Sequence, residues 1–490
     1  MVEYIYKVKG RKQIMKKKVI SAILCVSMVA GILAGCGGST GSSTTEAGKT
    51  EGTQAAATQA GTTEAGTDEA KGETAAADDT EKADANTELS GTLVVALWDN
   101  VSMQLFEDLD LAGKFQEVYP DANIEFEKLK DDSEYWNAMK MRASANQLPD
   151  IMFNKTFTLS RFKDYLVDLS DTEANKNNNI AEGYAVDGKV LGLPEKMTAE
   201  YVYYWKDMFK EAGVEVPSTW SELEEVSKKL QEHFGADNGD FMAIAMGGKD
   251  EWPTYPFTEF MPALESGNGQ NWNTMATQDE PFSEGTDFYK AYTKINSLFT
   301  SGVFGKDPVG IGNDQATALF AQKQAAMVAS GGWALTSISE GADSTDELGT
   351  FYLPTREKAE DPFRAITQGD NFMSITTHAK NPELAKAFVE FYFSDAWYPE
   401  YIKSQADDNT MKTVQKDKDP ILAQADELQP DKELVMYDGG GDDFTALVAE
   451  TTFDYKKLGA EMLVNGFDLP SALNDLNTKW KAAREKLSIK

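Results

Sequence analysis

One group of side chains lies directly after expected strands or in short loops, where a bound molecule could reach it. The group consists of Trp98, Asp99, Asn100, Asn154, Trp252, Tyr255 and Trp333. Carboxylates and amides form hydrogen bonds with hydroxyl groups, and aromatic planes pack on flat C–H faces. These residue types therefore indicate a site that binds a polyhydroxylated molecule in a crevice that excludes water.

Residues for nucleophilic or metal chemistry are scarce in this chain. It has two cysteines, Cys25 and Cys36, and two histidines, His233 and His378. These are too few for a thiolate or histidine-rich metal site, and we find no Ser-His-Asp set and no Gly-rich phosphate loop with a lysine. We therefore expect no catalytic residue, no metal and no cofactor.

The N-terminus is typical of an export signal that ends at a cysteine. Lys16 to Lys18 precede an apolar run from Val19 to Leu33. This run of about 15 residues is shorter than the ~20 that a membrane-spanning helix needs. The segment Leu33-Ala34-Gly35-Cys36 matches the bacterial lipobox, in which the cysteine receives a lipid before cleavage. We therefore expect residues 1–35 to be a signal peptide and Cys36 to anchor the chain on the extracytoplasmic face of the cell membrane.

The charge of the chain and its next segment suit an exported, tethered protein. The formal net charge is −33, although the signal peptide is basic. Nucleic-acid binding needs a basic surface, so we expect no nucleic-acid partner. Residues 36–89 consist mainly of Gly, Ser, Thr, Ala, Gln and acidic residues. Such a segment cannot bury enough apolar surface to fold, and we expect a disordered linker with a reach of roughly 40 Å.

From residue 90 onward, strand and helix patterns alternate. Apolar or alternating runs predict strands at 92–97, 124–126, 151–153, 190–193 (ended by Pro194), 201–204, 325–329 and 349–353. Apolar residues at helical spacing predict helices between these strands and through the C-terminal region. Thr219 and Glu222 have capping-box spacing and mark one helix start. About 400 residues exceed a usual single core, so we expect two α/β lobes with mostly parallel sheets.

Four segments, in this order, resemble motifs of a known family. They are Leu148-Pro149-Asp150-Ile151; Asp187-Gly188-Lys189-Val190-Leu191-Gly192-Leu193-Pro194; Gln324-Ala325-Ala326-Met327 with Gly331-Gly332-Trp333; and Gly369-Asp370-Asn371 with Asn381-Pro382-Glu383-Leu384-Ala385. From Gly91 to the C-terminus, the chain resembles the extracellular solute-binding proteins of ABC importers, in their maltose-binding-like, carbohydrate-oriented branch. The second segment leads into Tyr203-Tyr204-Trp205-Lys206. Trp205 departs from the family, which usually has Asn at this position.

The resemblance implies a two-lobe, periplasmic-binding-protein-like α/β fold with a ligand cleft between the lobes. Three hinge crossovers would lie near residues 196–201, 367–373 and 430–440. The solute-binding domain would span 90–490, with lobe 1 at about 90–197 and 373–432 and lobe 2 at about 200–368 and 438–490. Periplasmic binding proteins are a known example of hinge closure around a ligand.

The resemblance also adds candidates for ligand contact at the crossovers. These are Glu195, Thr198 and Glu200 at the first and Asp370 and Asn371 at the second. Trp333 matches an aromatic residue that the family often uses for stacking. The implied function is the substrate-binding component of an ABC importer, which captures a carbohydrate, we expect an oligosaccharide, and delivers it to the permease subunits. We expect the protein to be a monomer.

Two alternatives remain open at this point. The same fold could bind a non-sugar solute such as a polyamine, a peptide or iron. Paired tyrosines bind ferric iron in related binding proteins, but we interpret Tyr203 and Tyr204 as core residues. The chain could also be a secreted carbohydrate-active enzyme, because two carboxylates suffice for glycoside hydrolysis. With 80 Asp and Glu residues, some pair could always be nominated.

Overall fold

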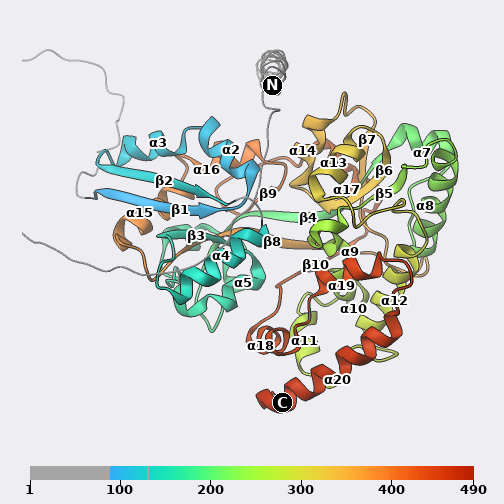
Figure 1. Ribbon diagram of the computed structural model, residues 1–490. Coiled ribbons are helices and arrows are strands. Elements are labelled where there is room, and N and C mark those ends of the chain that lie inside the picture. Colours follow the sequence, from blue (N-terminus) through green and yellow to red (C-terminus); the bar gives the residue numbers. More distant parts are fainter. Residues whose placement is uncertain (1–88, 130–131, 490) are drawn as a thin grey trace, which may run out of the picture. The chain divides into compact units, whose positions relative to one another are not determined.

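The computed structural model describes residues 89–129 and 132–489 (Figure 1). The predicted signal peptide, Cys36 and the predicted linker up to residue 88 lie outside the described residues. The described residues belong to one compact unit. Within them, no helix combines the length and the apolar character that crossing a membrane requires.

Within the described residues, ten strands form one mixed sheet. They are β1 (Gly91–Leu97), β2 (Ala122–Lys128), β3 (Ile151–Asn154), β4 (Leu193–Trp205), β5 (Met242–Ala245), β6 (Ala325–Gly331), β7 (Leu348–Phe351), β8 (Arg364–Ile375), β9 (Asp408–Asn409) and β10 (Glu433–Met436). The spatial order is β2-β1-β3-β8-β4-β6-β5, with β10 paired to β8, and β7 and β9 paired to β4. The expectation of mostly parallel sheets is wrong, because β4 runs antiparallel to every strand it pairs with and β8 runs antiparallel to β3.

The two long strands β4 and β8 pass from one half of the sheet to the other (Figure 1). Residues 193–199 of β4 pair with β8, whereas residues 200–205 pair with β6 and β7. In β8, residues 372–375 pair with β3 and residues 364–367 pair with β10. Each of these strands therefore belongs to both halves of the sheet and carries a chain crossing.

The apolar side chains form separate cores in two lobes. Lobe 1 has a core cluster on each face of β1 and β3, and lobe 2 has one larger cluster. The helices of lobe 1 are α2 (Asn100–Asp108), α3 (Leu111–Val118), α4 (Asp132–Ser144), α5 (Thr156–Arg161), α6 (Glu173–Asn177), α15 (Pro382–Tyr392) and α16 (Tyr398–Ser404). The helices of lobe 2 are α7 (Lys206–Ala212), α8 (Trp220–Gly235), α9 (Tyr255–Thr258), α10 (Met261–Ser266), α11 (Asn271–Ala276), α12 (Asp287–Phe299), α13 (Asn313–Ala321), α14 (Ala334–Gly341), α17 (Pro420–Leu428), α18 (Asp442–Thr451), α19 (Tyr455–Met462) and α20 (Leu469–Leu487).

The chain crosses between the lobes a third time, between Val414 and Leu422. Val414 packs in the core of lobe 1. Leu422 and Ala425 of α17 pack in the core of lobe 2, where α17 lies against β7. The sequence predicted this crossing near 430–440 and therefore assigned α17 to lobe 1. The structure places the crossing earlier because the apolar face of α17 covers the sheet of lobe 2.

The sequence predicted a capping box at Thr219 and a strand end at Pro194, and the structure has only the first. The predicted capping box of α8 is confirmed, because Thr219 Oγ1 accepts from the Glu222 N–H at 3.3 Å and the Glu222 carboxylate accepts from the Thr219 N–H at 3.2 Å. The predicted strand end at Pro194 is wrong, since β4 continues through it. A proline lacks the backbone N–H, but it is tolerated near the first residue of a strand.

Candidate ligand-binding site

The crossing strands bring five of the predicted site residues to the junction of the two lobes. Glu195, Thr198 and Glu200 lie on β4, and Asp370 and Asn371 lie on β8. The two strands pair antiparallel over this stretch. Strand pairing therefore joins groups that are far apart in the sequence into one polar layer between the lobes.

Glu195 is the centre of a buried hydrogen-bond network at this junction. Its carboxylate accepts hydrogen bonds from Asn371 Nδ2 at 2.8 Å and from the hydroxyls of Tyr392 at 2.6 Å and Tyr401 at 2.8 Å. Glu195 is fully buried, and Asn371 is 1% exposed. Both were predicted to contact the ligand, but burial leaves their polar atoms bonded within the protein. They hold β4 and β8 to α15 and α16 of lobe 1.

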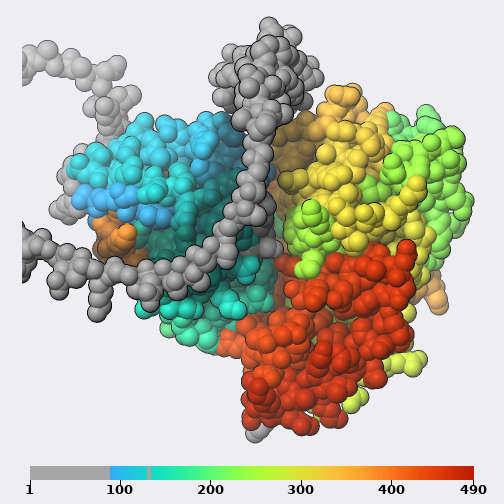
Figure 2. Space-filling model, viewed as in Figure 1, coloured from blue at the N-terminus to red at the C-terminus, as the bar shows by residue number. Residues whose placement is uncertain are grey.

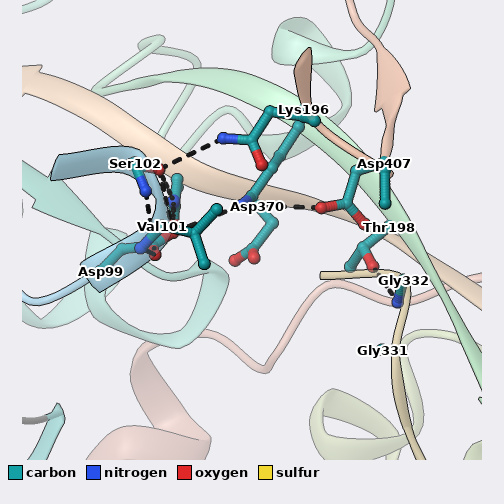
Figure 3. A network of polar contacts seen from close by, with 12 residues as sticks. Asp99, Val101, Ser102, Lys196, Thr198, Gly331, Gly332, Asp370 and Asp407 are labelled. Carbon is teal, nitrogen blue, oxygen red and sulfur yellow. Dashed lines mark hydrogen bonds and ion pairs between the residues drawn. The ribbon is translucent and has the colours of Figure 1, made fainter. Parts of the chain in front are cut away.

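Asp99 caps α2 and belongs to a cluster of charged groups at the same junction (Figure 3). Its carboxylate accepts from the N–H of Ser102 at 3.2 Å and from its hydroxyl at 3.0 Å. The Lys196 ammonium lies 3.4 Å from Asp99 and 3.6 Å from Asp407. Burial alone would raise the pKa of Asp99, but Lys196 and the hydrogen bonds from Asn371 and Ser102 outweigh it and lower that pKa. Asp99 therefore stays ionised and is occupied by protein donors.

Trp98 and Asp370 are connected through a lysine. The Lys155 ammonium forms an ion pair with Asp370 and lies 5.3 Å from the centroid of the Trp98 ring. The Trp98 ring lies 4.8 Å from Tyr135 and 5.0 Å from Trp136. Trp98 and Lys155 are only half-buried. This group of lobe 1 therefore keeps surface that a ligand can contact.

A second group on lobe 2 contains Trp252, Tyr255 and Trp333 beside Glu200. The Trp252 ring centroid lies 6.1 Å from that of Tyr255 and 5.9 Å from that of Trp333. The Tyr255 hydroxyl donates to Glu200 Oε2 at 2.7 Å and accepts from the Gly331 N–H at 2.9 Å. The three aromatic residues are half-buried. They therefore offer ring surface next to a carboxyl group.

Thr198 links the crossing strand β4 to the lobe 2 group. Its hydroxyl accepts from the Gly332 N–H at 3.2 Å, next to Trp333. Thr198 is 2% exposed, so it positions this turn instead of presenting a free hydroxyl. Figure 3 shows the Asp370 carboxylate between Asp99 on one side and Thr198 on the other.

The two predicted asparagines lie in different surroundings. Asn154 is fully buried, where its amide donates to Ser374 Oγ at 3.0 Å and accepts from Thr158 Oγ1 at 2.8 Å. Its side chain has no exposed surface in this arrangement of the lobes, and ligand contact by Asn154 stays a prediction. Asn100 is exposed at the start of α2.

The sequence prediction missed Lys155, Trp136 and Lys196. Lys155 directly follows Asn154 at the carboxyl end of β3, so the strand-end rule would have found it. Lys196 lies on the first crossover itself. Trp136 lies on α4, and its contact with Trp98 depends on tertiary packing that the sequence pattern does not show.

Two carboxyl groups of the site are shifted toward the neutral form. Burial raises the pKa of Glu195 to about 7, although Lys196 and Tyr392 act in the opposite direction. Burial also raises the pKa of Glu200 to about 8, against the hydrogen bond from Tyr255. Glu200 Oε1 is buried without a hydrogen-bond partner among the described residues. A neutral Glu200 could donate as well as accept a hydrogen bond.

The chemistry of this junction is that of binding. It combines carboxyl groups and a lysine with half-buried aromatic rings from both lobes. These groups can hydrogen-bond hydroxyls and pack on apolar ring faces. No group of three or more His, Cys, Asp or Glu side chains in the described part of the chain could hold a metal ion.

The chain matches the family model of the bacterial extracellular solute-binding proteins over residues 101–399, and it belongs to this family. The multiple sugar-binding protein of Streptococcus mutans is 26% identical over 252 residues, which cover 50% of this chain and 57% of that protein. A maltooligosaccharide ABC transporter solute-binding lipoprotein of Streptococcus pneumoniae is 25% identical over 226 residues, which cover 46% of this chain and 50% of that protein. The chain thus spans about half the length of the curated relatives it matches.

The fold is shared with solved solute-binding proteins. The solute-binding protein RafE, known from Streptococcus pneumoniae, was solved in complex with raffinose and is 23% identical to this chain. The TM-score is 0.66, and the match covers 81% of this chain and 100% of that chain. This likeness establishes the two-lobe solute-binding fold.

Proposed function

We propose that this protein is the membrane-anchored substrate-binding component of an ABC importer and captures an oligosaccharide between its lobes. The observation that carries the proposal is the pairing of half-buried tryptophans from both lobes with carboxyl groups on the crossing strands. Trp98 belongs to lobe 1, and Trp252 and Trp333 belong to lobe 2. Glu200 and Asp370 lie on β4 and β8, where they are 7% and 3% exposed, and Glu200 Oε1 has no hydrogen-bond partner among the described residues. Tryptophan faces cover the C–H surface of a sugar ring, while carboxyl groups bond its hydroxyls.

Ligand contact with both lobes would couple binding to hinge closure. A ligand shifts the balance between open and closed forms only by its difference in affinity for the two. Groups on both sides of the junction give a sugar more contacts when the lobes close. The closed form then docks on the permease. The names of the two curated relatives support a sugar as the ligand class.

The anchor is a separate part of the proposal. Residues 1–35 direct export, Cys36 carries the lipid, and residues 36–89 tether the solute-binding domain outside the cell membrane. The lipobox supports this assignment, and one relative is named a lipoprotein. The domain acts as a monomer, without a cofactor.

Calorimetric titration of the full chain with raffinose and with malto-, manno- and chito-oligosaccharides tests the binding proposal. At least one of them should bind at a one-to-one ratio and be recovered unchanged. Binding of none of these classes would contradict the proposal, and turnover of the bound sugar would instead indicate an enzyme.

Trp333→Ala should weaken binding of the sugar found in this way by roughly 1–3 kcal/mol, because a stacking face is lost. Trp333→Phe is the matched control and should retain most of the affinity, since it keeps an aromatic plane. Equal affinity of the alanine variant and the unmodified chain, with unchanged thermal unfolding, would remove Trp333 from the site.

A further inference from the structure

Asp442 makes a contact between the lobes that is distinct from the three chain crossings. It is the first residue of α18 in lobe 2, and its carboxylate accepts hydrogen bonds from the Ser160 hydroxyl and the Lys163 ammonium. Ser160 lies on α5 of lobe 1, and Lys163 follows this helix. Lys163 also pairs with Asp187 at 2.8 Å. One carboxylate of lobe 2 thus bridges two donors of lobe 1.

The glycine loop before α18 allows the lobes to approach this closely. Gly439 has a φ angle of +80°, which favours glycine. A Cβ atom at this position would lie 2.6 Å from Thr156 Oγ1 and 2.8 Å from the backbone nitrogen of Phe157. Thr156 and Phe157 form the start of α5. A side chain at residue 439 would therefore push α5 away from the loop that leads to Asp442.

Two further contacts join the lobes near α5. The Lys456 ammonium of α19 lies 5.3 Å from the centroid of the Phe157 ring. The Tyr184 hydroxyl of lobe 1 donates to the Tyr437 carbonyl at 3.2 Å. In Figure 2, the red C-terminal surface adjoins the teal surface of the segment that contains α5. The contacts therefore join the surroundings of α5 to the chain from β10 to α19.

We propose that the contact of Ser160 and Lys163 with Asp442 is a latch that holds the two lobes in the arrangement seen here. Gly439 allows the close approach of the lobes that this contact needs. The side chains of Lys163 and Asp442 are 29% and 49% exposed. Partly exposed ion pairs of this kind are weak and sensitive to salt. A weak latch can open when the lobes move, so it sets the resting balance between two lobe arrangements. This role does not depend on which solute is bound.

A distance measurement between the lobes tests the latch without any ligand. Met141 on α4 of lobe 1 is 68% exposed, and Val464 after α19 of lobe 2 is 50% exposed. Spin labels are attached to Met141→Cys and Val464→Cys in the full chain, with Cys25 and Cys36 replaced by serine. Pulsed electron paramagnetic resonance should show one main distance for this chain. When Asp442→Ala is added, the fraction of molecules with a second, different distance should be several-fold larger than in the parent.

The matched control is Asp443→Ala, which removes the same charge from the same turn of α18. Asp443 makes no hydrogen bond or ion pair with α5 in the described structure, so this variant should keep the parent distribution. Gly439→Ala should reproduce the second population by a steric route. The latch is refuted if Asp442→Ala and Gly439→Ala both fold and keep the parent distribution, or if Asp443→Ala changes it equally. Should Asp442→Ala fail to fold, Ser160→Ala decides in the same way.

Discussion

Burial divides the predicted site residues into two kinds. Glu195, Asn371 and Asn154 are buried, and their polar atoms bond to other protein groups. Trp98 and Trp333 instead are only half-buried. Residue type and strand-end position could predict where the lobes meet. They could not distinguish a supporting residue from an exposed one, because that depends on partners contributed by distant helices.

Glu200 gives a prediction at the same scale. Its pKa is raised to about 8 in the folded protein, so the fold favours the neutral carboxyl. The stability from this group is fully present below about pH 4.5 and is lost as pH rises through about 8. Glu200→Gln cannot ionise and therefore avoids this loss. The free energy of unfolding of the variant minus that of the unmodified chain should increase by roughly 1–4 kcal/mol from about pH 5 to about pH 8.

Urea unfolding of both proteins at these two pH values measures the effect. Glu232→Gln is the control, because it removes a carboxylate from an exposed position on α8. A Glu200→Gln variant that loses stability with pH as steeply as the unmodified chain would contradict the assignment.

At the scale of elements, short-range signals were enough for most strands and for several helix starts. Expected strands at 92–97, 325–329 and 349–353 correspond to β1, β6 and β7. The apolar face of α17 gave no indication of which lobe it would cover, and the third crossing was therefore misplaced. The continuity of β4 through Pro194 also went unrecognised, because it depends on pairing with β8, which holds Leu193 before the proline and residues 196–199 after it. Long-range packing placed α17, and long-range strand pairing placed the start of β4.

The capping box of α8 provides the test at this scale. Thr219→Ala removes the hydroxyl that accepts from the Glu222 N–H and should lower the free energy of unfolding by about 1 kcal/mol. Thr219→Ser keeps the hydroxyl and should preserve most of the stability. Denaturant unfolding distinguishes the two variants, and equal loss in both would show that packing of the threonine methyl group, not capping, is responsible.

At the scale of the whole molecule, the three crossings make each lobe discontinuous in sequence. The hinge therefore consists of a few positions in β4, in β8 and between Val414 and Leu422, instead of one loose linker. We expect such a hinge to allow only a limited motion of the lobes. The junction network around Glu195 lies on the same two strands that would bend.

The proposed lipid anchor also concerns the whole molecule. Cys36→Ser should move the protein from the membrane fraction to the medium, because the other cysteine of the chain, Cys25, lies inside the predicted signal peptide. Cys25→Ser lies inside the predicted signal peptide and should leave the protein on the membrane. Immunoblots of the two fractions from the producing bacterium measure this. Membrane retention of the Cys36→Ser variant would contradict lipid attachment at this residue.

The most direct test of the account is the distance between labels at residues 141 and 464 with and without the oligosaccharide that binds in the titration. If the sugar contacts groups on both lobes, saturating sugar should shift the label distances into one narrow population. Stoichiometric binding with an unchanged distance distribution would contradict closure of the lobes around the sugar.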